Sequence, residues 1–318
     1  MTTHKQAILS GLFGLCIADA LGVPVEFSSR ATRQADPVTT MRGYGTWNQP
    51  PGTWSDDSSL TLCLVAAIID GFSLEAIADN FCRWYTDADW TPHGEVFDIG
   101  NATQAAIFQL LQGVHPSQSG GLDERSNGNG ALMRILPMAF CHAQLPLGEL
   151  LECTHQVAGI THAHPRSQMA CGIYITIAVL LLQGQSLPSA YQQGIQQLKA
   201  HYAAAPFSQE LKHFDRILSG AIAQAPMDAI ESGGYVVHTL EAALWCLLNT
   251  DSYAAAVLQA VNLGGDTDTT AAVTGGLAGL AYGLKAIPAD WLEQLAQKEA
   301  IAELAEQLAI ALEPAVLS

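Results

Sequence analysis

The sequence predicts an all-α fold: a single compact domain over residues 1–318, built from roughly ten or more helices with its chemistry in the loops between them. Apolar residues recur at steps of three and four, which is typical of helices with one buried face. Alanine is abundant, and the alternation of β-branched residues that marks strands is scarce. Clusters of Gly, Pro and Asn separate the apolar segments, and none of them resembles a flexible linker between domains.

The clearest helical segments, in chain order, are 7–20, 60–69, 74–85, 171–182, 271–284 and 292–308. The first resembles a signal peptide, but it carries little positive charge before its apolar part. The fourth is too short to span a bilayer, so we expect both to be buried helices. Within the fifth, Gly275, Gly279 and Gly283 recur at every fourth position, which predicts close packing against another helix.

Composition indicates a globular protein and excludes several partners. Apolar residues make up 49% and charged residues 14% of the chain, enough for a sizeable core. Thirty acidic residues against thirteen basic ones give a net charge of −17, which disfavours anionic membranes and nucleic acid, except as a modified substrate. The seven cysteines are scattered and never spaced Cys-x-x-Cys, which predicts reduced, buried thiols and a cytoplasmic location.

Two short acidic clusters each precede a strongly apolar segment. Ser55-Asp56-Asp57 lies ahead of 60–69, and Asp266-Thr267-Asp268-Thr269 lies ahead of 271–284. Ser, Thr and Asp are common N-caps of helices, so capping alone is one explanation. A cap needs a single such residue, whereas each cluster supplies two carboxylates with adjacent hydroxyl groups. The clusters therefore indicate more than capping.

The helices that follow these clusters are too apolar to be exposed, so they should pack in the core, where their N-terminal ends could meet. Two carboxylates about 4 Å apart repel by roughly 4 kcal/mol at an effective dielectric of about 20. Helix dipoles offset only about 0.3–1 kcal/mol per charge. Carboxylate and hydroxyl oxygens favour Mg²⁺ or Mn²⁺, and four carboxylates suit two divalent cations better than one.

Other polar residues stand in or beside apolar segments. Glu26 follows the first helical segment, and Asp98 lies between apolar neighbours. Residues 127–131 form a Gly-rich loop that opens a helix and could present backbone N–H groups to a phosphate, although such loops are also common turns. His162 and His164 have no acid beside them and make a poor metal site by themselves.

Taken in this order, the motifs resemble those of the ADP-ribosylglycohydrolase family, which includes the dinitrogenase reductase-activating glycohydrolases. The resemblance extends from about residue 6 to about residue 290. It is carried by Asp19-Ala-Leu-Gly…Glu26, Ser55-Asp56-Asp57, Phe97-Asp98-Ile99-Gly100, Asn129-Gly130-Ala131-Leu132-Met133-Arg134, Thr161-His162 and Asn262-Leu-Gly-Gly-Asp-Thr-Asp-Thr. The last motif is the most specific. The family usually has Thr at the position of Ser55, and Ser retains the hydroxyl oxygen.

The resemblance implies an all-α domain around a binuclear Mg²⁺ or Mn²⁺ centre at the bottom of a cleft for ADP-ribose. The metal ligands it implies are Ser55, Asp56, Asp57, Asp266, Asp268 and Thr269. The residues it places along the ADP-ribose cleft are Asn127, Gly128, Asn129, Gly130, Ala131 and His162. Asp98 and Glu26 are the candidates for the acid or base, and the sequence leaves both open.

The implied reaction is hydrolysis of the bond at the anomeric carbon of an ADP-ribosylated protein or small molecule, with release of ADP-ribose. Two alternatives remain open at this point. One is a non-catalytic ADP-ribose-binding protein of the same fold. The other is a Mg²⁺-dependent diphosphate lyase of the terpenoid-synthase type, although Ser58, Ser59 and Leu60 follow Asp57 where such enzymes carry a third acid.

Overall fold

The structure, a computed structural model, describes residues 3–313 and confirms the all-α prediction. This part of the chain folds into fourteen α-helices joined by short 3-10 helices and turns, and its only β-type pairings are three isolated bridges. The helices are α1 (Thr3–Gly22), α2 (Arg30–Ala35), α3 (Asp56–Ile69), α4 (Leu74–Asp87), α5 (Asn101–Leu111), α6 (Leu147–Gly159), α7 (Pro165–Leu182), α8 (Leu187–His201), α9 (Asp215–Leu218), α10 (Val236–Leu248), α11 (Tyr253–Asn262), α12 (Thr267–Tyr282), α13 (Ala289–Gln294) and α14 (Lys298–Ala311).

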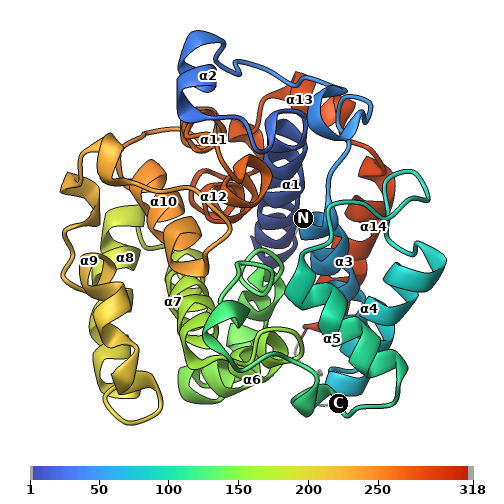
Figure 1. Cartoon of the computed structure of the whole chain (residues 1–318), viewed down its shortest axis with the longest axis vertical. Helices are drawn as coiled ribbons and strands as arrows, with labels where there is room; N and C mark the ends of the chain where they lie inside the picture. Colours follow the sequence, from blue (N-terminus) through green and yellow to red (C-terminus); the bar gives the residue numbers. More distant parts are fainter. Residues whose placement is uncertain (1–2, 314–318) are drawn as a thin grey trace.

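The helices pack around one continuous apolar core. Helices α1 and α12 run through its middle, with α3, α4, α5 and α14 on one side and α7 to α10 on the other (Figure 1). By length and composition α1 and α7 could each cross a membrane, yet both are buried within the protein. They are therefore the core helices that the apolar segments 7–20 and 171–182 predict.

Glycines allow α1 and α12 to approach at backbone contact. A methyl group at Gly14 would overlap the carbonyl oxygen of Gly275, and one at Gly279 would overlap the carbonyl oxygen of Ser10. The predicted role in close packing is thus confirmed for Gly275 and Gly279. It is wrong for Gly283, which ends α12 in a left-handed conformation (φ 80°) with open space around it. Because α12 begins at the second acidic cluster, this contact also sets where that cluster lies.

Replacement of Gly14 by Ala tests how strongly this contact supports the fold. We expect Gly14→Ala to lower the free energy of unfolding by about 1–3 kcal/mol, because the helices must separate to admit the methyl group. Gly148→Ala in α6 is the matched control, since no atom lies within 4 Å of its added methyl group. That change should be neutral or stabilise by up to about 1 kcal/mol. Urea unfolding measures both, and equal stability of the two variants would contradict the prediction.

Candidate metal and active site

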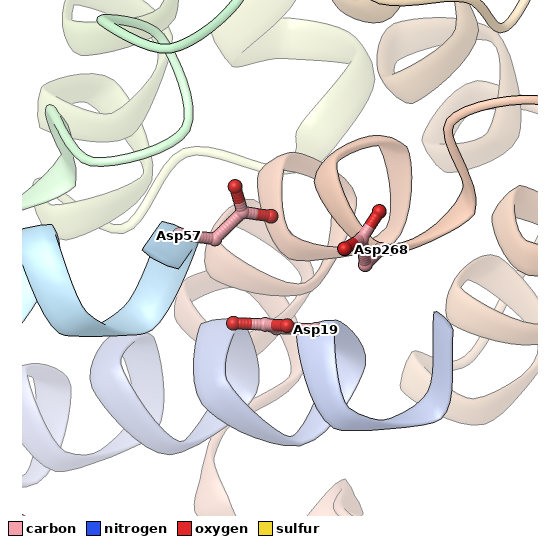
Figure 2. Close-up of side chains that lie close together, drawn as sticks. All are labelled: Asp19, Asp57 and Asp268. Carbon is pink, nitrogen blue, oxygen red and sulfur yellow. The ribbon is translucent and has the colours of Figure 1, made fainter. Parts of the chain in front are cut away.

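The N-terminal ends of α3 and α12 meet above α1, so the two acidic clusters converge. The hydroxyl of Thr269 on α12 donates a hydrogen bond of 3.2 Å to Oδ1 of Asp57 on α3, although 212 positions separate these residues in sequence. Figure 2 shows Asp57 and Asp268 facing each other, with Asp19 of α1 beside them. The contact that the sequence could only suggest is therefore present.

Capping does not account for the four aspartates. Ser55 is the N-cap of α3, and its hydroxyl accepts from the backbone N–H of Asp57. Asp56 and Asp57 lie in the first turn and are not needed as caps. Asp266 occupies the N-cap position of α12, but its side chain makes no capping hydrogen bond. Asp268, in the first turn of α12, accepts the backbone N–H of Thr269 at Oδ1, which leaves its Oδ2 available for another role.

Five acidic residues form two overlapping groups whose oxygens are close enough to share a cation. One group is Asp19, Asp57 and Asp268, and the other is Glu26, Asp266 and Asp268. Within each group, one oxygen per residue lies within 4.8 Å of the others. Asp268 belongs to both groups, which is the arrangement expected of an acid between two neighbouring ions.

Sequence reasoning assigned no role to Asp19, and the structure shows one. Its carboxylate is fully buried and accepts hydrogen bonds from the backbone N–H groups of Ser55 and Ser58 and from the Ser58 hydroxyl. These bonds attach the start of α3 to α1 and so place Asp56 and Asp57. Burial nevertheless raises the pKa of Asp19 to about 7. The available sequence signal was a single acid within an otherwise apolar helix.

The acids destabilise one another's charged forms. Burial raises the pKa values of Asp56, Asp57 and Asp268 well above the usual range of an aspartate. Neighbouring carboxylates raise all three pKa values further. Within residues 3–313, three buried carboxylate oxygens also have no hydrogen-bond partner: Asp57 Oδ2, Asp266 Oδ1 and Asp268 Oδ2. Such atoms are costly unless a cation or a proton meets them. Oxygen donors without nearby His or Cys fit a hard divalent cation.

Glu26 and Asp98 lie on the open side of the cluster. Burial, and then the charge of Asp98, raise the pKa of Glu26 to about 9. The Trp47 indole N–H donates to Oε2 of Glu26 at 2.5 Å. Burial raises the pKa of Asp98 to about 6, and its carboxyl interacts with those of Asp268 and Glu26. Asp98 also has a left-handed backbone (φ 61°), which is strained for a residue other than glycine.

A cavity of about 420 Å³ opens beside the cluster, within the usual size range for small-molecule sites. One wall is acidic, with Glu26, Asp56, Asp98 and Asp266, and Thr269 lies among them. Another part of the lining contains Gly128, Asn129, Gly130 and His162, which we call the Gly-rich wall. Some of the predicted metal and cleft residues thus line the same cavity. Sequence reasoning did not predict the lining residues Phe27, Thr103, Arg125, Met133 and Gly234.

The predicted loop 127–131 differs from expectation in two respects. It continues into turns instead of opening an α-helix, because the next helix is a 3-10 helix that begins only at Leu136. Asn127 and Ala131 are buried behind the cavity wall and do not line it. The Asn127 side chain is held by Ser167 and by the backbone oxygen of Glu124.

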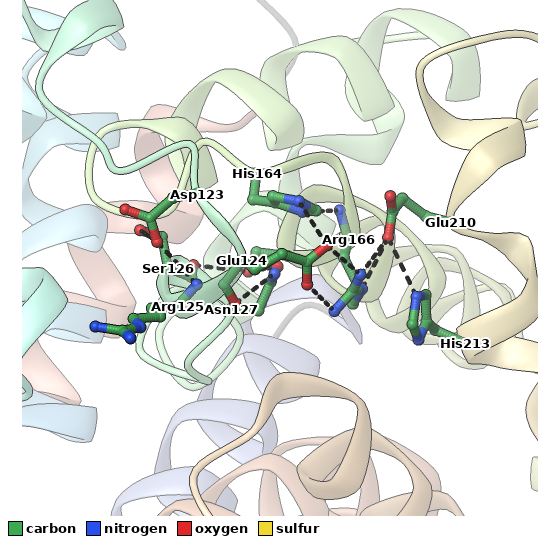
Figure 3. Close-up of polar contacts among 10 residues, drawn as sticks. Asp123, Glu124, Arg125, Ser126, Asn127, His164, Arg166, Glu210 and His213 are labelled. Carbon is green, nitrogen blue, oxygen red and sulfur yellow. Dashed lines mark hydrogen bonds and ion pairs between the residues drawn. The ribbon is translucent and has the colours of Figure 1, made fainter.

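Ion pairs fix the segment that leads into this loop. Arg166 at the start of α7 bonds Glu124 at 3.0 Å and Glu210 at 2.7 Å, as Figure 3 shows. Farther along the loop, the Asn129 amide donates to Oδ2 of Asp266 at 2.8 Å and to the Thr239 hydroxyl at 2.9 Å. Asn129 therefore connects the Gly-rich wall directly to the acidic wall.

Comparison with known proteins agrees with this geometry. The sequence model of the ADP-ribosylglycohydrolase family matches residues 1–315. The chain is 34% identical to the ADP-ribosylarginine hydrolase Tri1 of Serratia proteamaculans (strain 568), with 93% of this chain and 77% of that protein aligned. It is 28% identical to the ADP-ribosyl-[dinitrogen reductase] glycohydrolase of Rhodospirillum rubrum, with 93% and 92% aligned.

A solved structure described as an ADP-ribosylglycohydrolase-related protein complex superposes on this one with a TM-score of 0.82 at 30% identity. The superposition covers 98% of this chain and 99% of that one. The chain therefore belongs to the ADP-ribosylglycohydrolase family, and the predicted class of enzyme is confirmed.

Proposed function

We propose that the chain is a hydrolase that uses two divalent cations, Mg²⁺ or Mn²⁺, to release ADP-ribose from ADP-ribosylated arginine. The observation that carries the metal proposal is the meeting of the two acidic clusters with three buried, unpartnered carboxylate oxygens. The linkage follows the relatives from Serratia proteamaculans and Pseudomonas putida, both named ADP-ribosylarginine hydrolase, at 34% and 32% identity. A cytoplasmic location remains a prediction.

The residues that we assign to the cations are Ser55, Asp56, Asp57, Asp266, Asp268 and Thr269, with Glu26 beside them. Of these, Asp57, Asp266, Asp268 and Glu26 belong to the two groups of closely spaced carboxylate oxygens. Bound divalent ions would neutralise these acids, orient ribose hydroxyls and assist the ionisation of water. Asp19 already accepts several hydrogen bonds, so we assign it the positioning of α3 instead.

In the reaction, water adds to the anomeric carbon, the bond from that carbon to the arginine nitrogen breaks, and the guanidine leaves with a proton. Asp98 is the better acid/base candidate, because it lines the cavity and burial brings its pKa to about 6. Glu26 faces Asp266 and Asp268, which suits a residue that contacts the cations. The two alternative functions are disfavoured: the lyase by family membership and the non-catalytic binder by the complete set of acids.

The activity test is release of ADP-ribose from ADP-ribosylarginine with and without Mn²⁺ or Mg²⁺. We expect EDTA to abolish release and Asp98→Asn to lower kcat on the order of 10²–10⁴-fold, because the group that moves the proton is lost. Asp87→Asn, at an exposed acid outside the cluster, is the control and should retain full activity. Full activity of Asp98→Asn would contradict the assigned role.

The dependence of stability on pH tests the crowding of acids separately from activity. Without metal, the folded-state pKa values of Asp19 (about 7) and Glu26 (about 9) exceed the unfolded value of about 4, so the folded state binds more protons. The contribution of these two groups to the free energy of unfolding is fully present below about pH 4. It is lost as the pH rises through their folded-state pKa values. Buried histidines have the opposite effect, but chiefly below their unfolded pKa of about 6.5.

In EDTA we therefore expect Tm to fall between pH 6.5 and 8, a window below the ionisation of unfolded cysteines. Saturating Mn²⁺ should raise Tm more at pH 8 than at pH 6.5, because cations compete with protons for the carboxylates. Thermal unfolding followed by circular dichroism measures both effects. A metal-induced shift that is independent of pH would rule out this competition.

A neutralising substitution should affect the protein in opposite directions with and without metal. We expect Asp57→Asn to raise the metal-free Tm at pH 8 by about 2–6 °C. The substitution replaces a carboxyl whose ionisation burial and its neighbours oppose by a neutral amide, whose oxygen can still accept from Thr269. The same variant should lose most of the Mn²⁺-induced rise in Tm. Asp87→Asn should leave both quantities unchanged. A lower metal-free Tm for Asp57→Asn would show that Asp57 carries no repulsive strain.

A further inference from the structure

The structure buries the guanidinium of Arg134 directly behind the Gly-rich wall. Arg134 is fully buried, and among residues 3–313 it forms no ion pair. Its guanidinium lies 4.8 Å from the ring centroid of Phe81 and donates to the backbone oxygen of Gly130 and to the Thr161 hydroxyl, the latter at 2.7 Å. A buried guanidinium is costly, so its retention beside this wall calls for an explanation.

The hydrogen bonds from Arg134 have a fixed direction. A guanidinium can only donate, so the Thr161 oxygen accepts from it. The Thr161 oxygen also lies 2.7 Å from Nδ1 of His162. Thr161 has one hydroxyl proton, and no other acceptor for it is found in the described part of the chain. Donation to Nδ1 satisfies that proton, whereas a protonated Nδ1 would leave it buried without a partner. Nδ1 is therefore an acceptor, and the ring proton is on Nε2.

The Nε2 edge of His162 faces the cavity wall formed by the two glycines. A methyl group at Gly130 would lie 2.9 Å from Cε1 of His162, and one at Gly128 would lie 3.4 Å from Nε2. The absence of side chains at these positions leaves room for a ligand at the Nε2–H group. Burial, and then the charge of Arg134, lower the pKa of His162 to about 3, so the ring stays neutral. The cavity also contains the exposed Arg125, and an anion suits this wall.

We propose that Arg134 and Thr161 are positioning residues that hold His162 as a neutral Nε2–H donor for a phosphate oxygen of the substrate's diphosphate. This inference rests on the proposed function, because it takes the ligand to be an ADP-ribosyl group. It excludes His162 as a general base, since its free nitrogen is occupied by Thr161. The inference also gives the buried charge of Arg134 a role. Arg134 polarises the Thr161 hydroxyl, and this hydroxyl in turn polarises the imidazole that contacts the anion.

The tautomer is measured without any substrate. In the full chain labelled with ¹⁵N-histidine, long-range ¹H–¹⁵N correlation spectra at pH 7 report which ring nitrogen carries the proton, and His162→Gln identifies the His162 signals. We expect an unprotonated Nδ1 and a protonated Nε2. Thr161→Val should release this preference, and Thr161→Ser should restore it. A wild-type His162 with its proton on Nδ1, or on both nitrogens, would overturn the proposal.

Calorimetric titration with ADP-ribose tests the contact itself. His162→Leu should weaken binding by roughly tenfold or more, because the donor to a charged oxygen is lost. His162→Gln, whose amide N–H can reach a similar point, should remain within about threefold of the wild type. Equal affinity of the Leu variant and the wild type would overturn the contact. A third outcome separates the two proposals. If His162 has the expected tautomer but the wild-type protein neither binds ADP-ribose nor hydrolyses its conjugates, the proposed function is wrong, whereas the positioning of His162 by Arg134 and Thr161 is upheld.

Discussion

The site depends on the packing of α1 against α12. Gly14, Gly275 and Gly279 allow these helices to meet at backbone contact, and Asp19 on α1 then holds the start of α3 through the N–H groups of Ser55 and Ser58. Burial of apolar surface by three core helices thus forces carboxylates together that would separate if free to do so. The repulsion makes the site selective for cations, because a divalent ion removes more of it than a single proton does.

The cavity has two walls with opposite preferences, and one residue joins them. The acidic wall attracts cations, while the Gly-rich wall, with Arg134 behind it, suits an anion. Asn129 donates to Asp266 on the first wall and belongs to the loop that forms the second. A ligand that carries both hydroxyl groups and a diphosphate would contact both walls at once.

Local patterns predicted the helices and the acids, because periodicity and polar residues at the start of an apolar helix are properties of short segments. Position in space was not predictable in the same way. Asn129 and Asp266 are 137 positions apart, and nothing in either segment indicates their hydrogen bond. The family resemblance places both Asn127 and Asn129 along the cleft, yet the Asn127 side chain accepts a hydrogen bond from Ser167 instead. Arg134 was visible as part of a motif, but its complete burial appears only in three dimensions.

The backbone beside both candidate acids is held in an unfavourable conformation by the packing around it. Phe27, which follows Glu26, and Asp98 both have φ of 61°, a conformation that costs about 1–3 kcal/mol each for such residues. Trp47 contacts Phe27 and Phe97 at ring-centroid distances of 6.3 and 5.7 Å, and its N–H holds Glu26. Trp47 thus contacts Phe27, which follows Glu26, and Phe97, which precedes Asp98, so one side chain can keep both acids in place. Strain offset in this way favours a preorganised site over one that closes on its ligand.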